Sequence, residues 1–312
     1  MTGSSDVSVV IPYYNRDKYI DETMQSVLRQ TLKPLEIIIV NDCSQESSRR
    51  YLDRYSDVCK IVDLQANVGL AGARNAGASR ARGQFIAFLD DDDLWLPRKL
   101  EMQRRFMDEH PECAIVHTAA WLFFQDGHEE FFQRFDDGPM TLAQSLTNGY
   151  CALIPTALIR SEVMRDITGF DVNFRECEDR DFIVRCCAAG YRVEGISKPL
   201  ARIRRQDQDG LTKHHWRVFR SDLKMCWKHK RYYLRAYGPR GIVNFVLEKV
   251  QLPSTKTRYL RRGVRLLMRF VRIKYELRSN YTDPVLSGSR RQPLRVSPWP
   301  ADTTTVAGGN SL

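Results

Sequence analysis

Four consecutive aspartates, Asp90, Asp91, Asp92 and Asp93, directly follow the apolar residues 85–89. A short run of aromatic and aliphatic residues predicts a buried β-strand. Four carboxylates at one strand end repel one another and are costly to remove from water unless a cation balances them. Carboxylate oxygens suit hard divalent ions, especially ions that carry phosphate. The run therefore predicts a metal and phosphate site at the edge of an α/β sheet; the alternative is a solvated acidic turn that caps a helix.

The elements around this run alternate between strand and helix patterns. Strands are predicted at residues 7–11, 35–40, 60–64 and 84–89, and helices at residues 19–30 and 70–81. Strands that alternate with helices of this length predict parallel β-α-β units with right-handed crossovers. Ligands of such sheets bind beyond the carboxyl ends of the strands. Pro12 is expected to end the first strand, because it cannot donate a sheet hydrogen bond.

Four loops should meet at that edge of the sheet. They are residues 12–15, 41–44, 67–70 and 90–93. Asn, Asp, Gly and Ser are ordinary turn residues, so one such loop by itself would indicate only a turn. Four loops that converge on one edge predict a binding site.

The rest of the chain has a looser pattern. Strands are predicted at residues 114–117 and 157–160, and helices at residues 140–148 and 179–189. The last of these begins with acidic residues, which suit the positive end of a helix dipole. Residues 213–280 are basic with helical patterns. From residue 283 onward Pro, Ser, Thr and Gly dominate, which is typical of a disordered tail.

Charge divides the chain into two parts. Residues 1–197 hold 22 Lys and Arg against 31 Asp and Glu, whereas residues 198–312 hold 26 against 7. The second part is therefore expected to face something anionic. No uncharged apolar stretch is long enough to span a membrane, no secretory signal is evident, and the eight cysteines show neither CxxC nor Cys/His zinc spacing. These features favour a location in the reducing cytosol.

Four segments, taken in order, resemble family 2 of the glycosyltransferases, the inverting enzymes of the GT-A fold. They are VSVVIPYYNR, IIIVNDCSQESS, NVGLAGARNAGASRARGQFIAFLDDDDLWLP and GFDVNFRECEDRDFIVRC, and they span roughly residues 7–205. Their ordered combination is specific, although no single segment is. The resemblance implies an α/β GT-A domain, with a Rossmann-like mixed sheet flanked by helices, and here a basic α-helical extension follows it.

The resemblance also implies a donor nucleotide site at the first strand ends. Asp42 would accept a hydrogen bond from the N3–H of a uracil or similar pyrimidine. Pro12, Tyr14, Asn15 and Asn67 would line the nucleotide.

For the aspartate run, the resemblance implies a DxD pair made of Asp90 and Asp92. Asp92 would ligate Mn²⁺ or Mg²⁺ directly, and Asp90 would contact the ribose or a metal-bound water. Asp93 is expected to cap a helix that starts near residues 96–97. Asp91 stands where a small residue is frequent, so its role is left open.

A later segment carries the residue that would act on the acceptor. The resemblance makes Asp179 the general base, which takes a proton from an acceptor hydroxyl; the alternative is a capping role at the start of its helix. Glu178 is expected to orient its neighbours. Asp181 and Arg185 fit an i,i+4 surface pair without a chemical role.

Three further features leave alternatives open. Asn41 stands where an acidic residue is common, so Asp42 is alone in its loop. Residues 202–205 lie near the expected diphosphate contacts, yet they also fit an exposed basic strand. His214 and His215 are expected at the surface rather than at the metal.

Residues 258–275 form a basic amphipathic pattern, with arginines beside an apolar stripe. Such a helix can lie on an anionic membrane surface, or it can pack its stripe on the catalytic domain. Binding to nucleic acid is the rival role for this region, and it is disfavoured because no nucleic-acid-binding motif is present and the first part is acidic.

We therefore expect a GT-A catalytic domain at residues 1–210, a basic helical extension at 211–282 and a disordered tail at 283–312. The expected activity is transfer of a sugar, most simply from a UDP-sugar, to a hydroxyl of a saccharide or lipid-linked saccharide in cell-envelope polysaccharide or glycan biosynthesis. The expected location is the cytoplasm or the cytoplasmic membrane face. The alternative is a non-catalytic protein on the same fold that binds a sugar nucleotide, a nucleic acid or a membrane surface.

Overall fold

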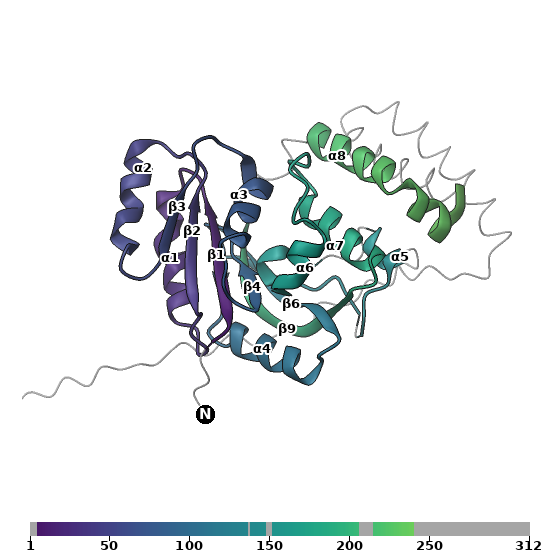
Figure 1. Ribbon diagram of the computed structural model, residues 1–312, viewed down its shortest axis with the longest axis horizontal. Coiled ribbons are helices and arrows are strands. Elements are labelled where there is room, and N and C mark those ends of the chain that lie inside the picture. Colours follow the sequence, from purple (N-terminus) through teal and green to yellow (C-terminus); the bar gives the residue numbers. More distant parts are fainter. Residues whose placement is uncertain (1–4, 137, 148–151, 206–214, 240–312) are drawn as a thin grey trace, which may run out of the picture.

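The computed structural model describes residues 5–136, 138–147, 152–205 and 215–239. Within these residues one mixed sheet of nine strands forms the centre of the molecule (Figure 1). Its strand order is β3-β2-β1-β4-β8-β6-β9-β5, and β7 pairs with β6 off this path.

The strands are β1 (Val7–Tyr13), β2 (Glu36–Asn41), β3 (Lys60–Asp63), β4 (Phe85–Phe88), β5 (Leu94–Trp95), β6 (Cys113–Phe124), β7 (Glu129–Phe132), β8 (Leu158–Arg160) and β9 (Arg192–Arg205). The α-helices are α1 (Asp17–Leu28), α2 (Glu46–Tyr51), α3 (Gly69–Ala78), α4 (Lys99–Glu109), α5 (Leu142–Ser145), α6 (Ser161–Asp166), α7 (Glu178–Ala188) and α8 (His215–Lys228). Two 3₁₀ turns are η1 (Leu52–Tyr55) and η2 (Ile154–Thr156).

The first half of the sheet is parallel, as predicted. Strand β1 pairs in parallel with β2 and β4, and β2 pairs in parallel with β3. Alternate side chains of β1 enter two cores: Val9 packs in the core that α1 and α4 cover, whereas Val10 packs in the core that α3, α6 and α7 cover. Helices on both faces explain why these strands read as continuous apolar runs.

The first strand is longer than expected, and the prediction that Pro12 ends it is wrong. The carbonyls of Val7 and Tyr13 accept hydrogen bonds from the β2 side, whereas the carbonyl of Val10 accepts one from Leu89 on the β4 side. Pro12 therefore faces the β4 side, where pairing with β1 stops at Val10. Its missing N–H costs no sheet hydrogen bond, so the strand continues through it.

The second half of the sheet depends on long-range pairing. Strand β6 extends well beyond the predicted residues 114–117, because it pairs with β7, β8 and β9. Strand β9 carries Pro199 and register shifts against β6, so little of it could be recognised from pattern alone. Its last residues pair with β5, where Leu94 lies opposite Arg202. This pairing brings β9 beside the aspartate run.

The helix after the aspartates starts later than predicted. The chain first forms β5 and then enters α4, whose N-cap is Arg98 without a side-chain cap. The expectation that Asp93 caps a helix near residues 96–97 is therefore wrong. Residues 94–95 pair with β9 as strand β5, so the helix starts only after them.

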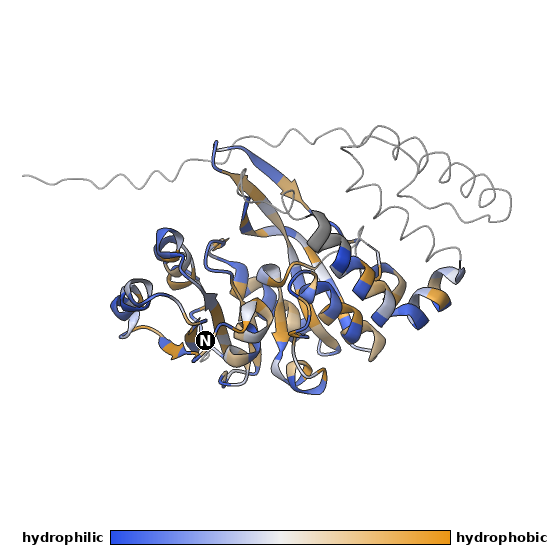
Figure 2. Cartoon of the chain, turned by 90° about the horizontal axis from the view of Figure 1, so that it is seen from above, coloured by the Kyte–Doolittle hydropathy of each residue, from blue (hydrophilic) through white to orange (hydrophobic). Residues whose placement is uncertain are grey.

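Helix α8 packs on α7 through a small apolar cluster. Met225 and Cys226 of α8 and Tyr233 beyond it bury against Val184 and Phe174. Figure 2 shows hydrophilic and hydrophobic residues alternating along the described helices. The predicted amphipathic segment 258–275, the tail 283–312 and His214 lie outside the described residues. No helix in the described ranges is both long and apolar enough to cross a membrane.

Candidate active site

Hydrogen bonds join the loops after the first strands at one edge of the sheet. The backbone N–H of Tyr14 donates to Asp91 (3.2 Å), and that of Asn15 donates to the hydroxyl of Ser44 (3.1 Å). The Asn15 side chain accepts from the backbone N–H of Gln45 (2.8 Å). Asn15 has a left-handed backbone (φ 52°), which asparagine tolerates. The convergence predicted from strand order is thus present.

Asp42 anchors the loop that leads into α3. Its carboxylate is 4% exposed and accepts the backbone N–H groups of Val68 (2.7 Å) and Gly69 (2.8 Å). The side chain of Asn67 donates to the Asp42 carbonyl (3.1 Å). Asp42 and Asn67 are therefore brought together. Their contact with a nucleotide stays a prediction, as does that of Tyr14 and Asn15, which are exposed, and of Pro12, which is buried.

The neutral residue at position 41 has a structural reason. The Asn41 amide donates to the carboxylate of Asp63 (2.8 Å), and its oxygen accepts the backbone N–H of Ser44 (3.1 Å). An amide can both donate and accept here, whereas an ionised carboxylate accepts only. An aspartate at this position would repel Asp63.

A buried arginine connects the aspartate run to α7. Arg74 is 2% exposed; it donates to Asp90 (2.7 Å) through one guanidinium nitrogen and to Glu178 (3.0 Å) through another. This residue was missed in the sequence, where it is one position in an Ala-rich helix. An arginine on the apolar face of a buried helix was the available signal, because such a charge needs a partner.

The nearby positive charge does not offset the burial of Asp91 and Asp92, the two carboxylates in the middle of the run. Burial raises the pKa of Asp91 to about 8, although Arg16 lowers it, and the neighbouring charge of Asp92 raises it further. Burial also raises the pKa of Asp92. The Arg16 guanidinium bonds to the Asp92 carboxylate, and its Nε lies 3.7 Å from Asp91. Arg16 is a second residue that the sequence did not single out.

Asp93 has a structural role and faces β9. Its carboxylate accepts the backbone N–H of Arg204 (2.8 Å), and its carbonyl accepts the Thr23 hydroxyl (3.0 Å). The Arg204 side chain donates to the carbonyl of Asp92 (2.9 Å). Residues 202–205 lie at the end of β9 and differ in exposure: the Arg202 side chain is 37% exposed and pairs with Glu129, whereas that of Arg204 is 13% exposed. Contact of this segment with a diphosphate stays a prediction.

Two acidic residues at the start of α7 complete the site. Glu178 is buried, and burial together with the charge of Asp179 raises its pKa to about 7. Asp179 is half-buried and accepts the N–H of Arg180 (2.7 Å). Burial raises the pKa of Asp179, and the nearby charge of Asp90 adds to the effect. The candidate base and the aspartate run therefore belong to one electrostatic site.

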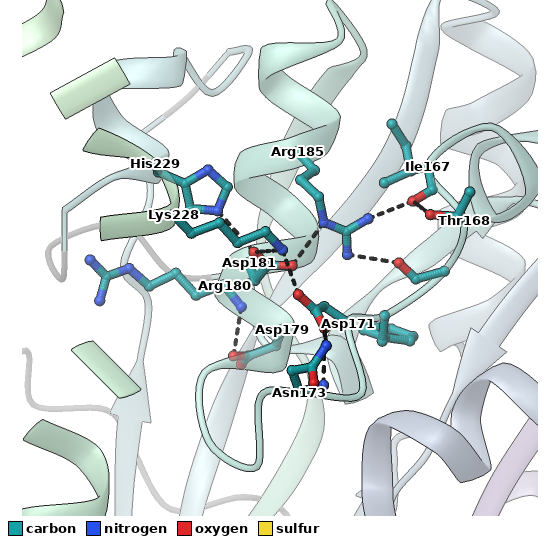
Figure 3. A network of polar contacts seen from close by, with 12 residues as sticks. Ile167, Thr168, Asp171, Asn173, Asp179, Arg180, Asp181, Arg185, Lys228 and His229 are labelled. Carbon is teal, nitrogen blue, oxygen red and sulfur yellow. Dashed lines mark hydrogen bonds and ion pairs between the residues drawn. The ribbon is translucent and has the colours of Figure 1, made fainter. Parts of the chain in front are cut away.

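A network of polar contacts further along α7 links this helix to α8 (Figure 3). Asp181 is fully buried; it pairs with two cations, Arg185 (2.8 Å) and Lys228 (2.6 Å), and bonds to the imidazole of His229 (2.8 Å). The predicted i,i+4 pair of Asp181 and Arg185 exists, but its placement on the surface is wrong. Packing of α8 covers it. Arg180 also reaches α8, where it pairs with Asp222 (3.0 Å).

The donor set at the aspartate run fits a hard divalent ion. Asp90, Asp91 and Asp92 offer carboxylate oxygens only, and the protein itself places a cation, the Arg16 guanidinium, against two of them. In the described ranges, the group of three potential ligands whose atoms lie within 4.8 Å of one another is a different one, His110, Glu112 and Glu194. Arg192 already pairs with both of its carboxylates, so this group reads as an ion-paired cluster.

The comparisons with known proteins agree with this geometry. Residues 8–167 match the family model for glycosyl transferase family 2. This chain belongs to glycosyltransferase family 2. A relative in Bacillus subtilis, named as the teichuronic acid biosynthesis glycosyltransferase TuaG, is 34% identical over 217 residues, which are 68% of this chain and 83% of TuaG. The relatives of this family member thus include one named for teichuronic acid biosynthesis.

Solved structures confirm the GT-A fold of this family 2 member. S. aureus TarS in complex with UDP superposes with a TM-score of 0.55 at 21% identity, over 81% of this chain and 73% of that one. The mannosyltransferase PcManGT from Pyrobaculum calidifontis, in complex with GDP-Man and Mn²⁺, gives a TM-score of 0.57 at 16% identity, over 88% and 85%. The roles of individual residues stay predictions.

Proposed function

We propose that this protein is an inverting, metal-dependent glycosyltransferase. It moves one sugar from a nucleotide-diphosphate sugar, preferably UDP-linked, to a hydroxyl of a saccharide or lipid-linked saccharide in polysaccharide biosynthesis. One observation carries the proposal: Arg74 bonds to Asp90 of the aspartate run and to Glu178 beside Asp179. A cation site and a candidate base thus share one electrostatic centre.

Two observations support the class of donor: the loops after β1 and β2, and the ligands of the similar solved structures. Asp42 and Asn67 hold the loop before α3 against the end of β2, which leaves exposed Tyr14 and Asn15 beside it. TarS has been solved with UDP and with UDP-GlcNAc, and PcManGT with GDP-Man. These complexes support a nucleotide sugar as donor. The preference for UDP rests on the expected contact of Asp42 with a pyrimidine.

Asp92 would hold Mn²⁺ or Mg²⁺ directly, with Asp90 beside it. Bound there, the ion would offset negative charge on the departing nucleoside diphosphate. Arg74 orients the Asp90 carboxylate through the 2.7 Å bond. Arg204 and Thr23 hold the backbone of the run in place through its carbonyls.

Asp179 would take the proton from the acceptor hydroxyl while that oxygen attacks the anomeric carbon opposite the leaving group. A single displacement inverts that carbon, so no enzyme nucleophile is needed. The raised pKa of Asp179 suits this role, because a base works best when its pKa lies near the working pH. Glu178 fixes the start of α7 through Arg74.

The place of action is proposed to be the cytoplasm or the cytoplasmic membrane face, with residues 258–275 as the contact to anionic lipid. This would suit a lipid-linked acceptor. The strongly basic second part of the chain supports it.

The test is a donor screen with the full chain. UDP-sugars and GDP-mannose are supplied with Mn²⁺ and saccharide acceptors, and nucleoside diphosphate release is measured. We expect Asp92→Ala to lower kcat/KM by at least about 100-fold, because metal stabilisation of the leaving group is worth several kcal/mol. The control is Asp57→Ala, which removes an exposed carboxylate before β3, at the opposite strand end. Unimpaired release by Asp92→Ala would refute the site.

A further inference from the structure

Arg16 brings a cation to the carboxylates that a divalent ion would need. Its guanidinium bonds to Asp92, and its Nε lies 3.7 Å from Asp91. The Asp91 and Asp92 side chains are 11% and 16% exposed, whereas that of Arg16 is 43% exposed. The arginine therefore reaches inward from the surface to two mostly buried carboxylates.

The backbone around Arg16 is held firmly, and its side chain is the part that can move. Asn15, in its left-handed conformation, bonds to Ser44 and Gln45 of the loop after β2. The Arg16 carbonyl accepts the N–H of Tyr19 at the start of α1 (3.1 Å). A half-exposed arginine can change rotamer toward solvent without breaking any of these bonds.

Two other arginines near the run, Arg74 and Arg204, have partners other than the carboxylates of Asp91 and Asp92. Arg74 bonds to Asp90 and Glu178 from a buried position. Arg204 donates to the backbone carbonyl of Asp92 and to Glu22. Within the described part of the chain, the ion pairs of Asp91 and Asp92 come from Arg16.

We propose that Arg16 competes with the divalent cation for Asp91 and Asp92, so that the cation binds well only together with a nucleoside diphosphate. A guanidinium and a metal ion cannot share the same carboxylate oxygens, and their charges repel. A diphosphate supplies new acceptors for the displaced guanidinium, which pairs well with phosphate oxygens. Arg16 would thus make cation binding depend on the nucleotide, and it would offset the charges of Asp91 and Asp92 between turnovers. This inference rests on the metal site proposed above.

The test measures Mn²⁺ binding to the full chain by calorimetry or by the electron paramagnetic resonance of free Mn²⁺, with and without UDP. Wild type is compared with Arg16→Gln. We expect Arg16→Gln to bind Mn²⁺ about tenfold more tightly without UDP, because a competing cation is removed. With UDP the gain should shrink or reverse, because the variant lacks the arginine contact with diphosphate.

The control is Arg98→Gln, which removes an equally charged residue, 62% exposed and paired with Glu101 outside the site. It should bind Mn²⁺ like wild type. Unchanged or weaker Mn²⁺ binding by Arg16→Gln without UDP would overturn the role of Arg16. A separate variant, Asp92→Ala, tests the site itself: if it binds Mn²⁺ with UDP as wild type does, the proposed metal site is wrong. Loss of binding in Asp92→Ala with no effect of Arg16→Gln refutes the competition alone.

Discussion

Two groups of ionisable residues meet on α7, and the charges of their carboxylates are balanced in opposite ways. The first, the acidic edge, comprises Asp90, Asp91, Asp92, Glu178 and Asp179. The second, the Asp181 network, comprises Asp171, Asp181, Arg185, Lys228 and His229 (Figure 3). At the acidic edge burial raises the pKa of Asp91, Asp92, Glu178 and Asp179. In the Asp181 network burial also raises the pKa of the carboxylates, but hydrogen bonds and nearby cations outweigh it and lower the pKa of Asp171 and Asp181.

The difference between the two groups shows which carboxylates remain available for chemistry. Asp179 and Asp181 are two residues apart on one helix, yet Asp181 pairs with two cations and bonds to His229, whereas Asp179 accepts the backbone N–H of Arg180. A carboxylate with satisfied partners stabilises a fold. One that lacks them holds a proton more readily and favours an incoming cation. The comparison therefore assigns reactivity to one side of α7 and support to the other.

The largest expected effect is loss of turnover in Asp179→Asn. The amide cannot accept the acceptor proton, so we expect kcat to fall by about 10²- to 10⁴-fold while the melting temperature stays near that of wild type. In wild type, kcat/KM should fall as pH drops through a pKa higher than that of an ordinary aspartate. Nucleoside diphosphate release measured from pH 4 to 9 checks both points. Full turnover by Asp179→Asn would remove its role as base.

The matched change, Asp181→Asn, should reverse this outcome. It removes the carboxylate partner of Arg185 and His229 in a mostly buried place and leaves Lys228 paired with Asp171, which we expect to cost about 3 kcal/mol of unfolding free energy. Turnover per folded molecule should stay within about threefold of wild type. Urea unfolding and active-site titration separate the two quantities. Wild-type stability combined with lost turnover would contradict the division of α7 into two sides.

The smallest expected effect concerns stability in acid. Burial raises the pKa of Asp171, but hydrogen bonds from Lys228 and Asn173 outweigh it and lower the pKa to about 2. A depressed folded-state pKa contributes stability above about pH 4, and this contribution is lost as pH falls toward 2. Asp171→Asn should therefore lose about 1 kcal/mol less than wild type over that range in urea unfolding. Asp57→Asn, an exposed change, is the control and should follow wild type. If the unfolding free energies of Asp171→Asn and wild type fell equally with pH, the pairing of Asp171 with Lys228 would not contribute to stability.

Much of the first half of the fold could be predicted, because its signals are local. Apolar runs such as β2 and β4 are short, continuous and followed by turn residues, and their parallel pairing follows from the helices between them. Strand order then places the loops after them at one edge. Asp42, Asn67 and Asp90 could be chosen on these grounds together with the family resemblance.

The remaining site residues depend on contacts between distant positions. Arg74 and Glu178 are 104 positions apart, and Arg204 and Asp93 are 111 apart. No local pattern pairs them, because the sequence around one residue does not indicate its distant partner. The same reason explains the wrong cap for Asp93 and the wrong surface position of Asp181. In both cases a distant element, β9 or α8, supplies the partner.

The sequence by itself determined the family, the parallel strands and the concentration of carboxylates at a strand end, because each depends on neighbouring residues. Only the tertiary structure decided which carboxylates are balanced. Burial and the placement of Arg16, Arg74 and Arg204 set the charge of the aspartate run, and α8 sets that of Asp181. Electrostatic energy depends on distance and on exclusion of water, and both are properties of the folded chain.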